Sequence, residues 1–95
     1  MMEILESEEI GKCVGVKINL HNAPFLILVA DKGFVMCGYL NIATAEKLGD
    51  AACMVSGVRD FQGMLKAKII AATTKAESLG VKEGMSCEEA LSLLS

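Results

Sequence analysis

The strongest constraint on the fold is the short apolar run FLILVA at residues 25–30. It has the length of a strand, and turn-forming residues bound it, with Pro24 before it and Gly33 after it. A strand that is apolar on both faces belongs in the middle of a sheet, where both faces are covered. The run therefore predicts a central strand.

Two further strand patterns flank this run. In residues 13–21 one row is apolar and the other is polar or small; the rows are Val14, Val16, Ile18 and Leu20, and Gly15, Lys17, Asn19 and His21. This alternation predicts a half-buried antiparallel strand. Residues 31–33 form a three-residue hairpin connection in which Gly33 suits a left-handed conformation. Residues 13–21, 25–30 and 34–40 are thus expected to form an antiparallel meander, with a less regular first strand at residues 2–7.

Four short helices are expected after residue 40. Each follows a residue whose side chain can accept a hydrogen bond from the first helical turn. The helices and their caps are 42–48 with Asn41, 61–66 with Asp60, 75–79 with Thr73 or Thr74, and 87–94 with the capping box of Ser86 and Glu89. The first of them is expected to stop at Gly49.

Helices join the expected strands 34–40, 52–56 and 67–72. Right-handed crossovers would make these three strands parallel neighbours. The predicted fold class is therefore α+β. An N-terminal antiparallel meander continues into β-α-β-α-β, and helices, including a C-terminal one, pack on a mixed sheet. At 95 residues the chain is expected to be a single domain.

Composition predicts self-association. The hydrophobic fraction is 53% and the mean hydropathy is +0.46, both high for a chain that exposes so much surface for its volume. Aromatic residues make up only 4%, so the core must be built from smaller apolar side chains. We expect a homodimer or a larger oligomer.

Charge and patterning disfavour several classes of partner. The net charge is −3 and no basic stripe is present, so neither nucleic acid nor an anionic membrane is expected to bind. No apolar run approaches the roughly 20 residues that span a bilayer. The acidic N-terminal sequence lacks the features of a signal peptide, so a cytoplasmic location is expected.

The four cysteines are expected to be free thiols. An even number would allow two disulfides, but a reducing cytoplasm disfavours them. The sequence contains no CxxC pair and a single histidine, His21, so no metal site is predicted. His21 is expected at an exposed strand end, and the strand at 25–30 would separate it from Cys37.

Chemistry could lie where strand 34–40 meets the helix start. Cys37 could be a thiol activated by the helix N-terminus, or a small hydrophobic core residue. Gly38 could allow close approach of a ligand, or make room for a packed helix. Tyr39 could donate its hydroxyl to a ligand or a partner subunit, and Asn41 is a cap that flanks the same strand end.

Two further loops could complete a site. One contains Ser56, Gly57 and Arg59, where an anion could bind beside the arginine. The other contains Thr73 and Thr74. If the three strands are parallel, residues 39–41, 56–60 and 72–75 lie at one edge of the sheet, and a small molecule could bind there. The sequence indicates no particular cofactor.

Two stretches of the sequence form a recognisable pattern: GFVMCGYLN, followed by KLGDAACMVSGV, and the closing GVKEGMSCEEAL. They resemble the YunC-like family of small bacterial and archaeal domains of unknown function. The resemblance runs from about residue 12 to residue 94. It implies a stand-alone mixed α/β domain without an established activity. The matching positions are Met36, Cys37, Gly38, Tyr39, Leu40, Asn41, Gly84, Met85 and Ser86.

Three hypotheses for function follow. The first is a homo-oligomeric ligand-binding or regulatory module. The second is a cysteine-dependent enzyme or thiol sensor that uses Cys37. The third is a structural subunit of a larger complex.

Overall fold

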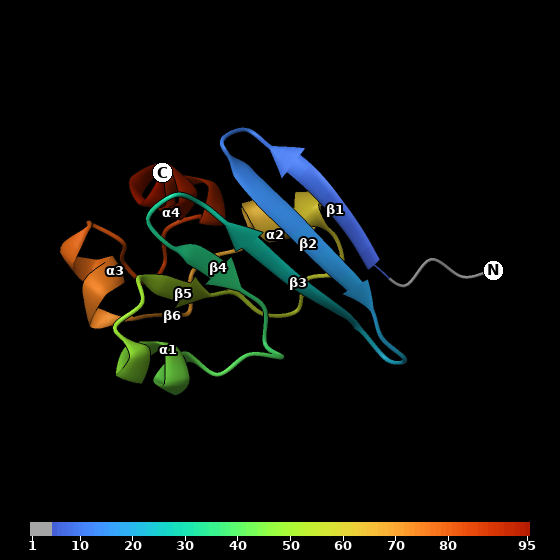
Figure 1. Cartoon of the computed structure of the whole chain (residues 1–95), viewed down its shortest axis with the longest axis horizontal. Coiled ribbons are helices and arrows are strands. Elements are labelled where there is room, and N and C mark those ends of the chain that lie inside the picture. The colour runs from blue at the N-terminus through green and yellow to red at the C-terminus, as the bar shows by residue number, and fades with distance from the viewer. Residues whose placement is uncertain (1–4) are drawn as a thin grey trace.

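The computed structural model describes residues 5–95 and contains one six-stranded mixed sheet, whose strands lie in chain order (Figure 1). The strands are β1 (Leu5–Ile10), β2 (Cys13–Asn19), β3 (Pro24–Val29), β4 (Phe34–Met36), β5 (Ala52–Met54) and β6 (Ala71–Ala72). The helices are α1 (Ile42–Leu48), α2 (Phe61–Lys66), α3 (Thr74–Ser78) and α4 (Cys87–Leu94). The α+β class, with its antiparallel meander and C-terminal helix, is confirmed.

The meander extends from β1 to β4, with β3 between β2 and β4 as predicted. The strand expected at 34–40 is shorter, because the chain turns after Met36 and the amide of Leu40 donates to the carbonyl oxygen of Cys37 at 3.2 Å. The first strand lies later than expected, at Leu5–Ile10, so acidic residues 8 and 9 are inside it. Residues 2–4 of the expected strand lie outside the described residues.

The prediction of three parallel strands is wrong for the last of them. β4 and β5 are parallel, but β5 and β6 are antiparallel, with Met54 opposite Ala71. The segment that contains α2 leaves the sheet at the end of β5 and returns to the sheet at that same end. β6 must therefore run antiparallel to β5. This reversal decides which loops share an edge.

The helix caps are confirmed. The side chains of Asn41, Asp60, Thr73 and Ser86 each accept an amide hydrogen bond from the first turn of their helix. Glu89 completes the capping box with Ser86. Gly49 ends α1 in a left-handed conformation, with φ at 78°.

Gly33 is required for a different reason than predicted. Its φ lies outside the left-handed region. A Cβ at this position would lie 2.1 Å from the carbonyl oxygen of Ala51, which also accepts the amide of Phe34 at 3.1 Å. The glycine therefore lets two backbones approach closely where the parallel pair begins.

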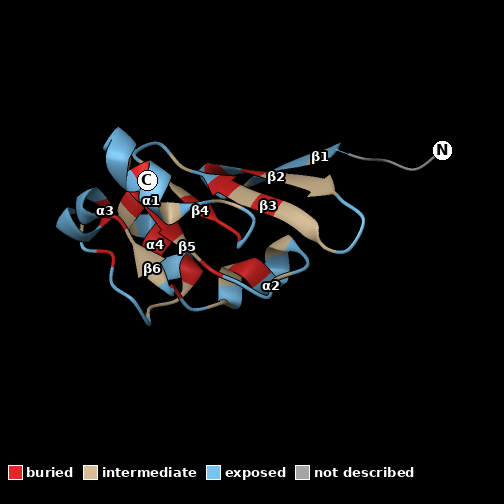
Figure 2. Ribbon diagram, turned by 90° about the horizontal axis from the view of Figure 1, so that it is seen from below, coloured by how far each residue is buried: buried red, intermediate tan, exposed pale blue. Residues whose placement is uncertain are grey.

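The main core lies between one face of the sheet and the helices α2, α3 and α4. Fully buried residues of the strands and helices meet there; they include Leu26, Leu28, Val35, Cys53, Met64, Ala76, Cys87, Ala90 and Leu94. On the opposite face α1 covers a smaller cluster of Met36, Ala45 and Ala52. Figure 2 shows α2 below the sheet and no helix above β1, β2 and β3.

The alternation of β2 is confirmed, but its polar and small row faces the helices. Gly15 is buried because the ring of Phe61 packs on it, and a Cβ at Gly15 would lie 2.7 Å from that ring. Val14, of the apolar row, is 45% exposed. The apolar row of β2 therefore lies on the face that α1 leaves mostly uncovered.

Candidate functional site

A cleft of about 350 Å³ lies where the parallel strands β4 and β5 end. We call it the turn cleft. Three segments line it, namely the start of β3, the turn after β4 and the loop after β5; their lining residues are Ala23, Pro24, Cys37, Gly38, Tyr39, Gly57, Val58 and Arg59. The carboxyl ends of neighbouring parallel strands are a common place for ligands in open α/β sheets.

Five of the nine candidates from the sequence line this cleft: Cys37, Gly38, Tyr39, Gly57 and Arg59. Ser56 lies beside it, since its Cβ is 4.0 Å from the position of a Cβ added at Gly38. Val58 belongs to the predicted loop 56–60, whereas nothing in the sequence predicts Ala23 and Pro24 at this site. Pro24 was interpreted only as a strand breaker, and nothing local in the sequence indicates that β3 begins next to the loop after β5.

Cys37 lines the cleft but is almost fully buried. The residue is only 4% exposed, and its Sγ accepts the amide of Leu26 at 3.3 Å. The amide of Cys37 in turn donates to the carbonyl oxygen of Leu26 at 3.1 Å. These bonds continue the β3–β4 pairing by one residue, so Cys37 helps to fix the turn that follows.

Gly38 is not required by the fold of the chain itself. Its φ lies outside the left-handed region. In the described part of the chain, an added Cβ would meet nothing closer than the Cβ of Ser56, so no packed helix explains the glycine. Because Gly38 has no side chain, it leaves free space at the wall of the cleft.

Arg59 supplies the positive charge of the cleft. It is exposed and is the one charged residue among those that line the cleft. Within residues 5–95 its guanidinium makes no hydrogen bond or ion pair. The neighbouring Asp60 is engaged in capping α2, where its Oδ1 accepts the amide of Gly63 at 2.7 Å.

Asn41 lies outside the turn cleft. Its Oδ1 accepts the amide of Ala43 at 2.8 Å as the cap of α1. It borders a second cavity of about 540 Å³ between the sheet and α1, which we call the α1 groove. Most of the groove is apolar, with Phe25, Phe34 and Leu48 among its lining residues.

Thr73 and Thr74 do not join the other candidates, because β6 is antiparallel. Thr73 lies at the start of β5, at the opposite end of the strand from the turn cleft. Its buried hydroxyl donates to the carbonyl oxygen of Asp50 at 2.7 Å and accepts the amides of Ala52 at 3.0 Å and Ala76 at 3.3 Å. Its hydrogen-bonding capacity is used within the fold.

Thr74 fastens α3 to α1. Its hydroxyl donates to Oε1 of Glu46, and its amide donates to Oε2 of Glu46 at 2.9 Å. These two bonds lower the pKa of the Glu46 carboxyl below its usual value, because they favour the charged form. The interaction is structural, so the predicted edge site loses both threonines.

All four cysteines are free, as predicted, and the structure shows that all four are buried. Burial raises the pKa of Cys53 and of Cys87 to about 12, and it raises the pKa of Cys13 as well. Cys53 and Cys87 belong to the main core, where the uncharged thiol is the favoured form. These three thiols are core residues.

No metal-binding cluster is found in the part of the chain that the structure describes. Across residues 5–95, no three His, Cys, Asp or Glu side chains are grouped so that they could hold a metal ion. His21 is exposed, and β3 lies between the strand that leads to it and β4. Among the same residues, no helix has the length and apolar character needed to cross a membrane.

Comparisons with known proteins agree with the resemblance seen in the sequence. Residues 36–94 match a domain of unknown function, DUF1805. The chain is 40% identical over 80 residues to the uncharacterised protein YunC of Bacillus subtilis, covering 80% of this chain and 79% of that protein.

The fold is also similar to a solved structure. The crystal structure of TA1206, a protein of unknown function from Thermoplasma acidophilum, matches with a TM-score of 0.86 and 38% identity. The match covers 96% of this chain and 91% of that one. The matched segment 36–94 includes the turn after β4 and the loop after β5, which together form most of the turn cleft. The chain belongs to the DUF1805 family of small domains of unknown function.

Proposed function

We propose that this protein is a homo-oligomeric binding module that holds a small anionic molecule in the turn cleft. The observation that carries the proposal is the environment of Arg59. Its positively charged side chain lines the cleft and makes no hydrogen bond or ion pair within residues 5–95. A guanidinium group suits carboxylates and phosphates, because its fork of N–H donors matches two oxygen atoms at once.

The rest of the cleft supports a ligand of metabolite size. Its volume of about 350 Å³ is near the lower end of the range for small-molecule pockets, roughly 300–1,000 Å³. The amides of Gly38 and Tyr39 make no hydrogen bond within the described residues, so they remain available as further donors. The missing side chain of Gly38 would let a ligand approach this backbone closely.

An NMR titration tests the proposal. The ¹⁵N-labelled protein would be titrated with inorganic phosphate, a sugar phosphate and succinate in turn. We expect at least one of them to cause saturable shifts of the amides at residues 37–39 and 57–59. Arg59→Gln should weaken that binding about tenfold or more, the loss expected for one charge-assisted pair.

Lys66→Gln is the matched control. It removes one positive charge from the exposed end of α2, outside the turn cleft, so binding should be unchanged. Binding that survives Arg59→Gln, or no saturable shift with any of the three probes, would contradict an anion site at Arg59.

The cysteine-dependent hypothesis has one observation in its favour, which is that Cys37 lines the same cleft. The sulfur is almost fully buried and already accepts a backbone amide. That geometry fits a residue that holds the turn in place better than it fits a nucleophile, so we place Cys37 second to Arg59. The hypothesis of a structural subunit has no specific contact to support it.

A further inference from the structure

A second cavity adjoins the turn cleft, at the end of the sheet where β2 stops and β3 begins. Its volume is about 360 Å³, and we call it the polar pocket because most of its lining residues are polar. Ala23, Pro24 and Arg59 line both this pocket and the turn cleft. The two cavities therefore meet at these residues, and one ligand can extend from one cavity into the other.

The polar pocket accounts for a part of β2 that the core leaves unexplained. The polar and small row of this strand faces the helices, where Gly15 lies under the ring of Phe61. Lys17 and Asn19 follow in the same row, and His21 comes just after the strand ends. A sheet face that packs on helices normally carries apolar side chains. Here its polar residues line a cavity instead.

The charged side chains of the two cavities have one sign. Lys17, His21 and Arg59 line the polar pocket, and no acidic residue lines either cavity. Within residues 5–95 none of these three side chains makes a hydrogen bond or an ion pair. Lys17 lies opposite Glu6 in the strand register, but Oε2 of Glu6 accepts a hydrogen bond from Nδ2 of Asn19 at 3.0 Å. Three donors, of which His21 is also cationic when protonated, thus remain available to an anion.

Acidic residues surround a separate cavity on the other side of Lys17. This cavity has a volume of about 450 Å³, and Glu6, Glu8 and Asp60 line it together with Lys17. Their carboxylates would repel an anion from that side. Of the two cavities that Lys17 borders, only the polar pocket therefore suits a negatively charged group.

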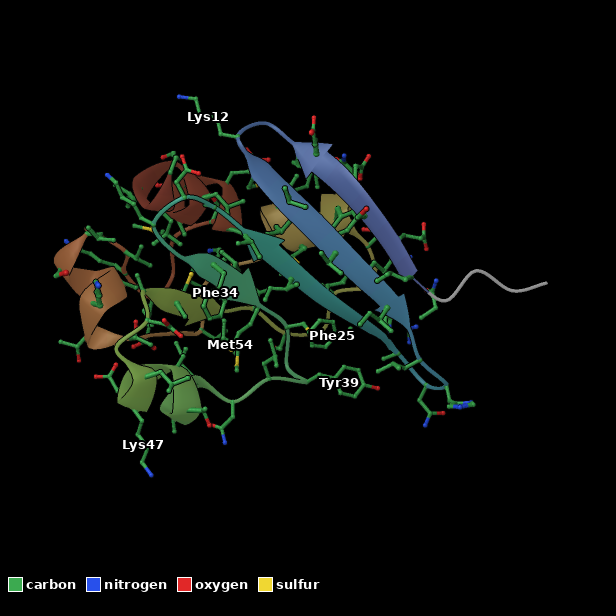
Figure 3. All side chains as sticks on the ribbon, viewed as in Figure 1. Lys12, Phe25, Phe34, Tyr39, Lys47 and Met54 are labelled. Carbon is green, nitrogen blue, oxygen red and sulfur yellow. The ribbon has the colours of Figure 1, made fainter. Side chains whose placement is uncertain are left out.

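The turn cleft suits the uncharged part of such a ligand. Figure 3 shows Tyr39 projecting from the turn after β4 towards the loop that joins β2 and β3. Tyr39 is 52% exposed, so its ring and its hydroxyl can both contact a small polar molecule. Gly38 beside it leaves free space at the cleft wall. The size of the cleft, about 350 Å³, limits this part of the ligand to that of a small metabolite.

We propose that the ligand is a phosphate monoester of a small metabolite. Its phosphate group binds in the polar pocket to Lys17, His21 and Arg59, and its organic part lies in the turn cleft beside Tyr39. A phosphate monoester carries about 1.5 to 2 negative charges at pH 7 and three acceptor oxygens, so it can use all three donors. A single carboxylate can be satisfied by the arginine alone. The inference rests on the proposed function, because both place the anion at Arg59.

NMR titrations of the ¹⁵N-labelled protein with three probes test this inference. Glycerol 3-phosphate should shift the amides at residues 17–22 together with those at 37–39 and 57–59, because it occupies both cavities. Inorganic phosphate has no organic part, so it should shift the amides at 17–22 and 59 and leave those at 38 and 39 unchanged. Glycerate, which has one carboxylate, should bind about tenfold more weakly than glycerol 3-phosphate.

The double variant Lys17→Gln/His21→Gln should weaken the binding of glycerol 3-phosphate about tenfold or more, because it removes two of the three donors to the phosphate. His21 is exposed and Lys17 is half-buried without a partner in residues 5–95, so the amide spectrum should remain that of a folded protein. Should the change at Lys17 disturb β2, His21→Gln alone should still weaken binding about threefold.

Lys12→Gln is the matched control. It removes one positive charge from the turn before β2, and Figure 3 shows Lys12 at the end of that strand away from the β2–β3 loop. Lys12 lines neither the turn cleft nor the polar pocket, so glycerol 3-phosphate should bind this variant as it binds the wild type.

The two proposals can fail separately. Binding that depends on Arg59 but is unchanged in the double variant would overturn the polar pocket as the phosphate site and leave the anion site at Arg59 standing. Binding that depends on the polar pocket but not on Arg59 would support the pocket and remove the site at Arg59. Glycerate that binds as tightly as glycerol 3-phosphate would overturn the phosphate class, and no saturable shift with any probe would overturn both proposals.

A lipid headgroup presents the same monoester on a membrane. We expect the protein not to sediment with vesicles of phosphatidylcholine and phosphatidic acid, because an anionic surface repels a chain of net charge −3. Sedimentation with these vesicles that is lost in the double variant, together with no binding of glycerol 3-phosphate, would overturn the assignment to a soluble metabolite.

Discussion

At the amino end of the parallel pair β4–β5, the backbone of Gly33 touches that of Ala51, and the hydroxyl of Thr73 uses three hydrogen bonds. At the carboxyl end of the same pair, Gly38 has space around it, and Arg59 has no partner within residues 5–95. The chain thus joins its strands tightly at one end and leaves room at the other. Substitutions at the amino end should therefore affect stability, and substitutions at the carboxyl end should affect binding.

Gly33→Ala should have the largest effect. The new Cβ would lie 2.1 Å from the carbonyl oxygen of Ala51, and backbone atoms cannot move aside as a flexible side chain can. We expect the free energy of unfolding to fall by about 3 kcal/mol or more, measured by urea denaturation. An alanine variant of wild-type stability would show that the amino end is not tightly packed.

Thr73→Val should have an intermediate effect. It keeps the shape of the side chain but leaves the buried amide of Ala52 without its acceptor and α3 without its cap. We expect a loss of about 2 kcal/mol in the same assay. Thr73→Ser restores the hydroxyl and should recover most of it; equal losses in both variants would mean that the methyl group matters more than the hydrogen bonds.

Gly38→Ala should change stability least. The conformation and the space at this position accept a Cβ, so we expect a change within about 1 kcal/mol, and a small gain is possible because alanine restricts the unfolded chain. The same variant should weaken any ligand that approaches the turn closely. A destabilisation as large as that of Gly33→Ala would remove the contrast between the two ends.

Local features of this fold could be predicted from the sequence. The caps at Asn41, Asp60, Thr73 and Ser86 were all found because a cap and its target lie within three residues of each other. The central position of β3 followed from its apolar character on both faces, and the meander followed from short turns between alternating strands.

Features that depend on distant parts of the chain could not be predicted from the sequence. The reversal of β6 depends on where α2 packs, and the role of Gly33 depends on Ala51, which is on another strand. For the same reason only two of the three loops expected at one edge of the sheet lie together. The turn after β4 and the loop after β5 do meet, but Thr73 and Thr74 could be placed only once the direction of β6 was known.

The buried thiols make the opening of this core measurable. Only the thiolate reacts with alkylating reagents, and with a pKa of about 12 neither Cys53 nor Cys87 forms it appreciably at neutral pH while the core is closed. Their modification must therefore pass through molecules that have opened, so its rate reports how often that happens. Cys53 lies on β5 and Cys87 begins α4. Equal rates at the two thiols would mean that the sheet and the C-terminal helix come apart in one event, and unequal rates would show which of them yields first.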